Sequence, residues 1–303
     1  MSMTSAPVKR REIHNHHMDS TRWNDFKFRD GDVVVATYAK SGTTWTQQIV
    51  AQLIFAGQEG VDVHHISPWI DLRIMPPEAY QGVEAQTHRR SVKTHLPVDA
   101  LVFSPKAKYI YIGRDGRDAV WSFYNHHANA NERWFGALNG APGRVGPPID
   151  PVDRPVDDYF RRWLAEDGFP IWPFWENIRS WWAERERANV LLMHFNDMKA
   201  DLAGSIRRIA RHLDITLDDK AFAAAVDHSS FDYMKRNAAQ MAPLGGAMWH
   251  GGGDTFIYKG TNGRWRDVLT NADNDAYEAK ALAELGPECA HWLALGEGRK
   301  AQN

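Results

Sequence analysis

The sequence predicts an α/β fold, with a parallel central sheet flanked by helices. Three runs have the apolar, β-branched or aromatic character of buried strands. They are residues 33–38, 108–113 and 190–195. Apolar residues at helical spacing follow each run, and strands that alternate with helices indicate a parallel sheet with crossover helices. Ligands bind such sheets beyond the carboxyl ends of the strands, so those ends are where we expect the site.

The first strand ends in a short polar turn, residues 40–45, with the sequence Lys-Ser-Gly-Thr-Thr-Trp. Trp45, Ile49 and Leu53 then recur at helical spacing. The first turn of that helix has unpaired N–H groups and the positive end of the helix dipole, and Lys40 adds a full charge. The turn is therefore predicted to bind a multiply charged anion. The alternative is a polar turn with no ligand.

A histidine and a lysine share one face of the predicted short strand 91–97. Lys93 and His95 are two residues apart, and residues at that spacing point to the same side of a strand. A proton acceptor beside a cation suits a reaction in which one oxygen loses a proton and another gains charge. The alternative is that His95 is structural.

An arginine ends the strand 108–113, and a serine follows eight residues later on a predicted helix. Arg114 and Ser122 together offer a planar fork of donors and a hydroxyl, which suit a terminal phosphate. Asp118 is the expected cap of this helix. The alternative is that Arg114 forms a salt bridge with Asp115 or Asp118 at the turn.

These segments, in this order, resemble the motifs of the cytosolic-type, 3′-phosphoadenosine 5′-phosphosulfate (PAPS)-dependent sulfotransferases, and the chain looks like a bacterial member. Residues 38–45 resemble Y-P-K-S-G-T-T-W, with Ala39 in place of proline. The Lys93–Pro97 segment resembles K-T-H-L-P, and the resemblance continues over about residues 23–270. Three further segments resemble Y-E-D-M, T-S-F-x-x-M-K-x-N and R-K-G-x-x-G-D-W-K. They are residues 195–198, 229–237 and 258–266.

The resemblance implies the P-loop-NTPase-like sulfotransferase fold, as a single domain over residues 21–303. It also implies transfer of a sulfuryl group from PAPS to a hydroxyl or amine of a small-molecule acceptor. Lys40, Lys93 and His95 fall on the catalytic positions, with His95 as general base, and no metal is implied. The positions that match the nucleotide site are Lys40, Ser41, Gly42, Thr43, Thr44, Trp45, Arg114, Ser122, Phe195, Ser229, Phe231, Tyr258, Lys259 and Gly260.

Some positions depart from the family pattern. Phe195 replaces a tyrosine, Tyr258 replaces an arginine and Arg264 replaces an aspartate. Arg264 is therefore expected to supply the charge that Tyr258 lacks. Of the dimer motif of animal members, which would lie over residues 266–275, only Thr270 is retained, so that mode of dimerisation is not expected.

The connection 129–157 is rich in glycine and proline, and is predicted to be a structureless lid over the acceptor. Thirteen tryptophans are present; most are expected in the core, and some are expected to line a hydrophobic or aromatic acceptor site. Residues 1–20 are polar and histidine-rich, and are predicted to be a disordered tail without a metal site.

The composition limits the function classes. A net charge of -2 gives no overall field for nucleic acid or an anionic membrane, and Cys289 is the only cysteine, so no disulfide framework is possible. The sequence has no run of about 18 apolar residues, so we expect a cytoplasmic protein without a membrane anchor. The oligomeric state stays open.

Two alternative functions remain at this point. One is a nucleotide kinase of the same broad fold, although the lysine of the loop precedes Ser41 and Gly42 and so does not match the Walker pattern. The other is a nucleotide-binding protein without catalytic activity. Retention of both Lys40 and His95 favours an enzyme.

Overall fold

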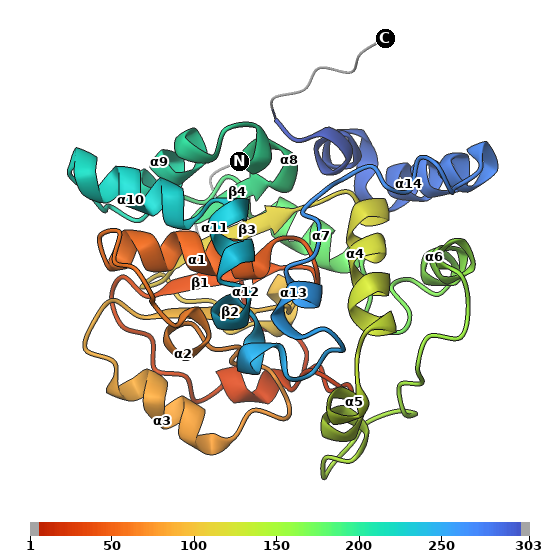
Figure 1. The fold of residues 1–303 in the computed structure, drawn as a ribbon, viewed down its shortest axis with the longest axis horizontal. Coiled ribbons are helices and arrows are strands. Elements are labelled where there is room, and N and C mark those ends of the chain that lie inside the picture. The colour runs from red at the N-terminus through yellow and green to blue at the C-terminus, as the bar shows by residue number, and fades with distance from the viewer. Residues whose placement is uncertain (1–5, 298–303) are drawn as a thin grey trace.

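A four-stranded parallel sheet lies at the centre of the structure, a computed structural model that describes residues 6–297 (Figure 1). The strand order is β2-β1-β3-β4. The strands are β1 Val33–Thr37, β2 Ser91–Thr94, β3 Lys108–Gly113 and β4 Val190–His194. All three strand pairings are parallel, which confirms the predicted α/β class.

Helices surround this sheet, as Figure 1 shows. The α-helices are α1 Thr43–Ile54, α2 Val63–Ile66, α3 Pro77–Ala85, α4 Gly116–Ala128, α5 Glu132–Asn139, α6 Val156–Ala165, α7 Trp175–Ala183, α8 Phe195–Ala200, α9 Leu202–His212, α10 Asp219–His228, α11 Phe231–Arg236, α12 Ala238–Met241, α13 Gly252–Phe256 and α14 Asn271–Leu295. Short 3₁₀ helices are η1 Ser20–Trp23, η2 Val98–Ala100 and η3 Pro243–Gly246. Among residues 6–297, no helix is both long enough and apolar enough to cross a membrane.

The sheet separates the two largest hydrophobic clusters of the described residues, because alternate residues of each strand point to opposite faces. Val33 and Val35 pack into the smaller cluster with apolar residues of α1 and α9. Val34 and Ala36 belong to the larger cluster, which contains many aromatic rings of α4, α6, α7 and α14. Six of the seven tryptophans between residues 121 and 182 are buried, as expected for core residues. They are Trp121, Trp134, Trp163, Trp172, Trp175 and Trp181.

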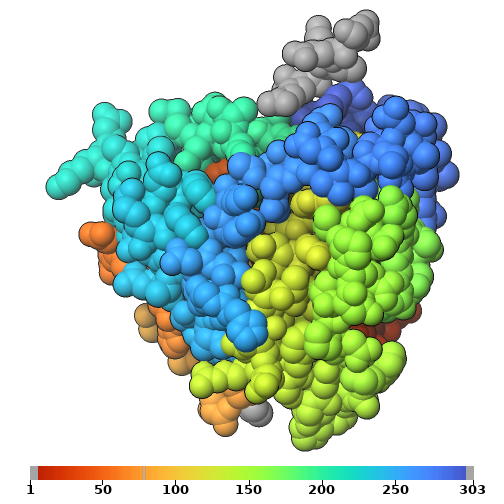
Figure 2. Space-filling model, turned by 45° about the vertical axis from the view of Figure 1, so that its right-hand side comes forward, coloured from red at the N-terminus to blue at the C-terminus, as the bar shows by residue number. Residues whose placement is uncertain are grey.

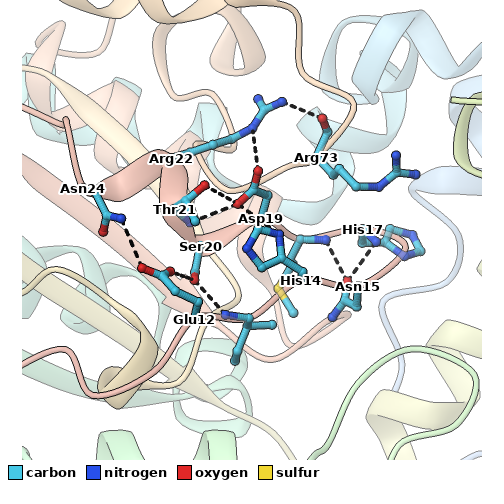
Figure 3. A network of polar contacts seen from close by, with 12 residues as sticks. Glu12, His14, Asn15, His17, Asp19, Ser20, Thr21, Arg22, Asn24 and Arg73 are labelled. Atoms are coloured by element: carbon cyan, nitrogen blue, oxygen red, sulfur yellow. Dashed lines mark hydrogen bonds and ion pairs between the residues drawn. The ribbon is translucent and has the colours of Figure 1, made fainter. Parts of the chain in front are cut away.

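The amino-terminal segment is ordered against the body of the protein, so the predicted disordered tail is wrong for residues 6–20; residues 1–5 lie outside the described part. Met18 is buried and pairs with Leu72 in a β-bridge. Asp19 accepts hydrogen bonds from the backbone N–H and the hydroxyl of Thr21, and so caps η1. Figure 3 shows this network of polar side chains, in which Ser20 bonds back to Glu12 and to the N–H of Ile13. Local polarity suggested disorder, but these bonds satisfy the polar groups within the fold.

Two further local predictions need correction. The connection 129–157 is not structureless throughout, because α5 occupies part of it and Asn131 caps that helix by accepting hydrogen bonds from the N–H groups of Arg133 and Trp134. The cap of α4 is Asp115 rather than Asp118, because its carboxylate accepts from the N–H of Arg117.

Candidate active site

Residues 40–44, at the turn between β1 and α1, form an open group of backbone N–H donors that we call the cradle. Lys40 has φ 63° and Gly42 has φ 105°, so the chain turns sharply before α1 begins at Thr43. A Cβ atom on Gly42 would lie 2.9 Å from Cδ2 of Phe195, and only glycine fits there. No side chain caps the N–H groups of α1 at Gly42, and the buried Oγ of Ser41 has no hydrogen-bond partner among the described residues. These donors are arranged for an anion.

Lys40 adds a partly buried ammonium group to the cradle. Burial first, and then the nearby cations of Arg114 and Lys93, lower its pKa to about 7. Its Nζ lies 3.4 Å from Nδ1 of His126 and 4.7 Å from the centre of the Phe256 ring. An anion bound in the cradle would favour the charged form of Lys40 and raise this pKa.

His95 lies just beyond the carboxyl end of β2, beside the end of β1. Its Nδ1 is 2.8 Å from the carbonyl oxygen of Thr37, and a carbonyl can only accept, so Nδ1 carries the proton. The lone pair is therefore on Nε2. The hydroxyl of Thr37 is also hydrogen-bonded to the hydroxyl of Thr43, at 2.7 Å. Thr37 therefore links His95 to the first residue of α1.

Burial is the main cause that lowers the pKa of His95 to about 3, and the charges of Lys93 and Lys40 lower it further. The imidazole is consequently neutral at physiological pH and able to accept a proton. Lys93, one of these two cations, has its own pKa lowered to about 8, chiefly by burial. The three predicted catalytic residues, Lys40, Lys93 and His95, are thus close enough for the charges of the two lysines to lower the pKa of the histidine.

Arg114 extends from the end of β3 to the next part of the site. Its guanidinium stacks 4.2 Å from the centre of the Phe195 ring, and it donates to Oδ1 of Asn262 and to the carbonyl oxygen of Lys40. The alternative salt bridge at the turn is formed by another arginine, since Asp115 pairs with Arg117 at 2.8 Å.

The loop that precedes Trp265 closes around Arg114. Asp118 accepts a hydrogen bond from the N–H of Gly263, and Nζ of Lys199 donates to the carbonyl oxygen of Gly260 at 2.7 Å. Arg264 lies close enough to lower the pKa of Arg114, whose largest cause of lowering is burial. Arg114 in turn lowers the pKa of Lys199, again after burial. The three cations form a second basic site, as a terminal phosphate would require.

Sequence reasoning missed Lys199 and Asn262. The one signal for Lys199 is its position four residues after Phe195 on α8, which places both on one helix face. Nothing local marks Asn262, whose partner Arg114 is 148 residues away. Lys259 lies over the ring of Tyr258, at 5.2 Å, and Ser122 lies two turns into α4.

Aromatic rings lie beside both basic sites: Phe195 lies against Gly42 and Arg114, and Phe231 lies against Gly260. The rings of Trp45 and Phe195 meet edge to face at 5.3 Å, and the indole N–H of Trp45 donates to the carbonyl oxygen of Ser229. Phe231 is 42% exposed, and a Cβ atom on Gly260 would lie 2.7 Å from it. The Oγ of Ser229 is buried without a partner among residues 6–297. Exposed and buried aromatic faces with an unpartnered hydroxyl suit a flat heterocyclic base.

On the other side of His95, aromatic residues from distant segments converge. Its ring contacts Trp69 at 4.7 Å and Trp172 at 5.6 Å. Beside Lys40, the ring of His126 packs against Trp249, at 4.8 Å. The segment around Trp249 is held to the α4–α5 connection by backbone hydrogen bonds between Asn131 and Met248 and between His250 and Asn129, and Figure 2 shows these segments side by side on this face.

Comparison with known proteins identifies the family. Residues 30–284 match the model of the sulfotransferase domain. The chain belongs to the sulfotransferase family. A glycolipid sulfotransferase of Mycobacterium tuberculosis is 31% identical, over 97% of each chain. Sulfotransferase 1B1 of Mus musculus is 30% identical, over 85% of this chain and 84% of its own length.

Solved structures confirm the fold of this sulfotransferase. Mouse SULT7A1, crystallised with PAP (adenosine 3′,5′-bisphosphate), matches with a TM-score of 0.67 and 20% identity over 90% of each chain. Retinol dehydratase with retinol and PAP also matches with a TM-score of 0.67, at 23% identity, over 88% of this chain and 84% of its own. The predicted family and fold are confirmed, and the nucleotide kinase alternative is excluded by the family.

Proposed function

We propose that this sulfotransferase transfers the sulfuryl group of PAPS to a hydroxyl group of a small-molecule acceptor, with His95 as general base. The observation that carries the proposal is the position of His95, whose Nε2 is free to accept a proton while Lys40 and Lys93 act on the same ring. A base beside two cations fits transfer of a sulfuryl group between oxygen atoms.

The 5′-phosphosulfate end of PAPS is assigned to the cradle before α1. Its donors are Lys40, the hydroxyl of Ser41, the N–H groups of Gly42, Thr43 and Thr44, and the hydroxyls of the two threonines. The unpartnered Oγ of Ser41 supports this assignment, because a buried hydroxyl gains most from a ligand that supplies the missing bond.

The 3′-phosphate is assigned to the second basic site, formed by Arg114, Lys199 and Arg264 together with Ser122 and the loop 258–260. Tyr258 stands where the family has an arginine, and we assign the positive charge of that arginine to Arg264. Arg264 is close enough to Arg114 for its charge to lower the pKa of Arg114. Trp45, Phe195, Phe231 and Ser229 are assigned to the adenine, because Phe195 lies against both Gly42 and Arg114, Trp45 bonds to the carbonyl oxygen of Ser229, and Phe231 lies against Gly260.

In the proposed reaction, the acceptor hydroxyl gives its proton to Nε2 of His95 while its oxygen forms a bond to sulfur. The bond between sulfur and the bridging phosphate oxygen breaks, and adenosine 3′,5′-bisphosphate leaves with the electron pair of that bond. Lys40 and Lys93 stabilise the charge that develops on the departing oxygen. Thr37 keeps the proton on Nδ1 of His95 and so holds the lone pair on Nε2.

The acceptor is proposed to lie against the aromatic residues beside His95, with the connection 129–157 and the segment around Trp249 as a lid. The mycobacterial relative is a glycolipid sulfotransferase, and a lipid-linked or hydrophobic hydroxyl compound fits walls made of indole rings. We further propose that residues 6–20 and the rest of the described chain act as a single domain, that the enzyme works in the cytoplasm, and that it needs no metal.

The proposed function is tested with ³⁵S-labelled PAPS and a panel of alcohols, phenols and glycosides. Time-dependent transfer of label to an acceptor, without added metal and in the presence of EDTA, is the expected result. Calorimetric binding of PAP without transfer to any acceptor would instead support the alternative of a nucleotide-binding protein without activity.

A further inference from the structure

A second histidine, His17, shares the aromatic surroundings of His95. The ring of His17 lies 6.2 Å from that of Trp69 and 5.6 Å from that of Trp172, and these are the same two indoles that contact His95. Trp134, from α5, completes this group at 5.7 Å. Two imidazoles that are far apart in the sequence therefore meet around the same pair of tryptophans.

The backbone around His17 is fixed on both sides. Oδ1 of Asn15 accepts hydrogen bonds from the N–H groups of His17 and Met18, at 2.8 and 2.7 Å. The carbonyl oxygen of His17 accepts from the N–H of Arg73 at 2.6 Å. Figure 3 shows His17 at the opposite end of this network from Asn24. The position of the ring is thus built into the fold of the segment.

A chain of hydrogen bonds determines which nitrogen of His17 carries the proton. Nε2 of His16 lies 2.9 Å from the carbonyl oxygen of Pro170, which can only accept, so His16 is protonated on Nε2. Burial lowers the pKa of both histidines, so each is neutral, and Nδ1 of His16 is left to accept a bond from Nδ1 of His17. The lone pair of His17 consequently lies on Nε2, as it does in His95.

The acceptor side therefore offers two neutral imidazoles that accept hydrogen bonds and at least one group that donates. The ring of Trp172 packs against both imidazoles, and its indole N–H is buried without a partner among residues 6–297. A simple alcohol has one O–H to donate and would leave one imidazole without a bond. A buried acceptor that is left unpaired weakens binding, whereas a second hydroxyl on the acceptor satisfies it.

We propose that His17 is a specificity-determining residue: its Nε2 accepts a hydrogen bond from a second hydroxyl, adjacent to the hydroxyl that is sulfated. The indole N–H of Trp172 donates to an oxygen of the same ligand. The acceptor class is thus a vicinal diol, as found in a sugar ring, and the faces of Trp69 and Trp172 suit the apolar side of such a ring. This inference rests on the proposed function, since it concerns the acceptor of that reaction.

The test compares trans-1,2-cyclohexanediol with cyclohexanol as acceptors of ³⁵S-sulfate from PAPS. For the natural protein, kcat/KM for the diol is expected to be at least about tenfold higher than for cyclohexanol, as one additional hydrogen bond in a buried site would give. In His17→Phe, this ratio is expected to fall to about one, with the main change in the diol. The matched control is His14→Phe, because His14 belongs to the same segment, has a side chain that is 45% exposed, and should leave the ratio unchanged.

A second variant, His17→Gln, guards against misfolding, because its side-chain oxygen retains an acceptor and should preserve part of the preference for the diol. Binding of PAP by calorimetry establishes that each variant is folded. Equal use of both alcohols by the natural protein, or an unchanged ratio in a folded His17→Phe, would overturn the inference and leave the proposed function intact. Failure to sulfate any acceptor of the wider panel would overturn the proposed function itself.

Discussion

At the scale of single residues, the chemistry depends on which nitrogen of His95 is free. The sequence indicates that Lys93 and His95 share a face of the strand. It does not indicate the tautomer of His95, because the group that decides it, the carbonyl oxygen of Thr37, lies 58 residues earlier in the chain. The same limit applies to Lys40, whose role follows from its sequence position while its lowered pKa follows from burial and from Arg114.

Replacement of His95 by asparagine removes the proposed base and retains a polar side chain. The rate constant kcat is expected to fall by about 10²- to 10⁴-fold, which is the usual contribution of a positioned base. The affinity for PAP should stay within a few-fold of the natural value, because His95 does not belong to the cradle. Steady-state kinetics and calorimetry measure the two quantities; an unchanged kcat would show that another group accepts the proton.

The affinity for PAP is expected to weaken as the pH rises above about 7. Burial lowers the pKa of Lys40 to about 7, so its ammonium is lost above that pH, whereas the nucleotide's phosphates are already ionised because their second pKa is about 6. One proton taken up on binding gives a slope approaching one unit of log Kd per pH unit. Lys40→Met should bind PAP more weakly and lose most of this slope, which calorimetry between pH 6 and 9 measures. A slope of equal size in the variant would assign the proton to another group, of which Lys93, with a pKa of about 8, is the nearest candidate.

At the scale of elements, the predictable part of the site is the part that consists of strand ends and the turns after them. The cradle and Arg114 follow strands that the apolar pattern marks, Phe195 ends the third such run, and His95 belongs to the predicted short strand 91–97. Parallel strands bring these ends to one edge. Lys199, Asn262 and the amino-terminal segment escape such reasoning, because their positions depend on partners far away in the sequence, such as Gly260 for Lys199 and Leu72 for Met18. Helix α5 escapes it because glycine and proline dominate the connection around it.

The turn before α1 is expected to tolerate only glycine at position 42. Gly42→Ala places a side chain at φ 105°, against Phe195, and should destabilise the protein by about 1–3 kcal/mol and weaken PAP binding by at least about tenfold. Gly60→Ala is the matched control, because Gly60 has φ 73° with open space around it and lies outside the site. It should lower stability and leave PAP binding unchanged. Urea denaturation and calorimetry give both quantities; normal PAP binding by Gly42→Ala would refute the assigned cradle.

At the scale of the whole molecule, α14 closes the fold behind the second basic site. Arg117 on α4 is buried between the rings of Trp265 and Tyr277, at 4.0 and 4.6 Å. It also pairs with the buried Asp115 and reaches Glu278 on α14. Helix α14 is thus attached to the turn that carries Arg114. The contacts that stabilise α14 therefore also fix the position of Arg114 in the second basic site.

Loss of this attachment should cost far more than loss of a surface ion pair. Arg117→Met leaves the carboxylate of Asp115 buried without its main partner, and should lower the free energy of unfolding by about 3–5 kcal/mol. Arg161→Met is the matched control, since Arg161 also links to α14, through Asp273, but is 44% exposed, so solvent screens the pair and its loss should change the free energy of unfolding far less. Thermal and urea unfolding measure both; equal losses would mean that α14 is held by apolar packing alone.

We propose that the strand ends at one edge of the sheet hold the sulfate donor with its reactive end facing Nε2 of His95. The decisive experiment is a crystal structure of the protein with PAP. We expect the 5′-phosphate on the N–H groups of residues 42–44, the 3′-phosphate beside Arg114 and Arg264, and His95 next to the 5′ end. A nucleotide bound elsewhere, or bound in the reverse orientation with its 3′-phosphate in the cradle, would contradict it.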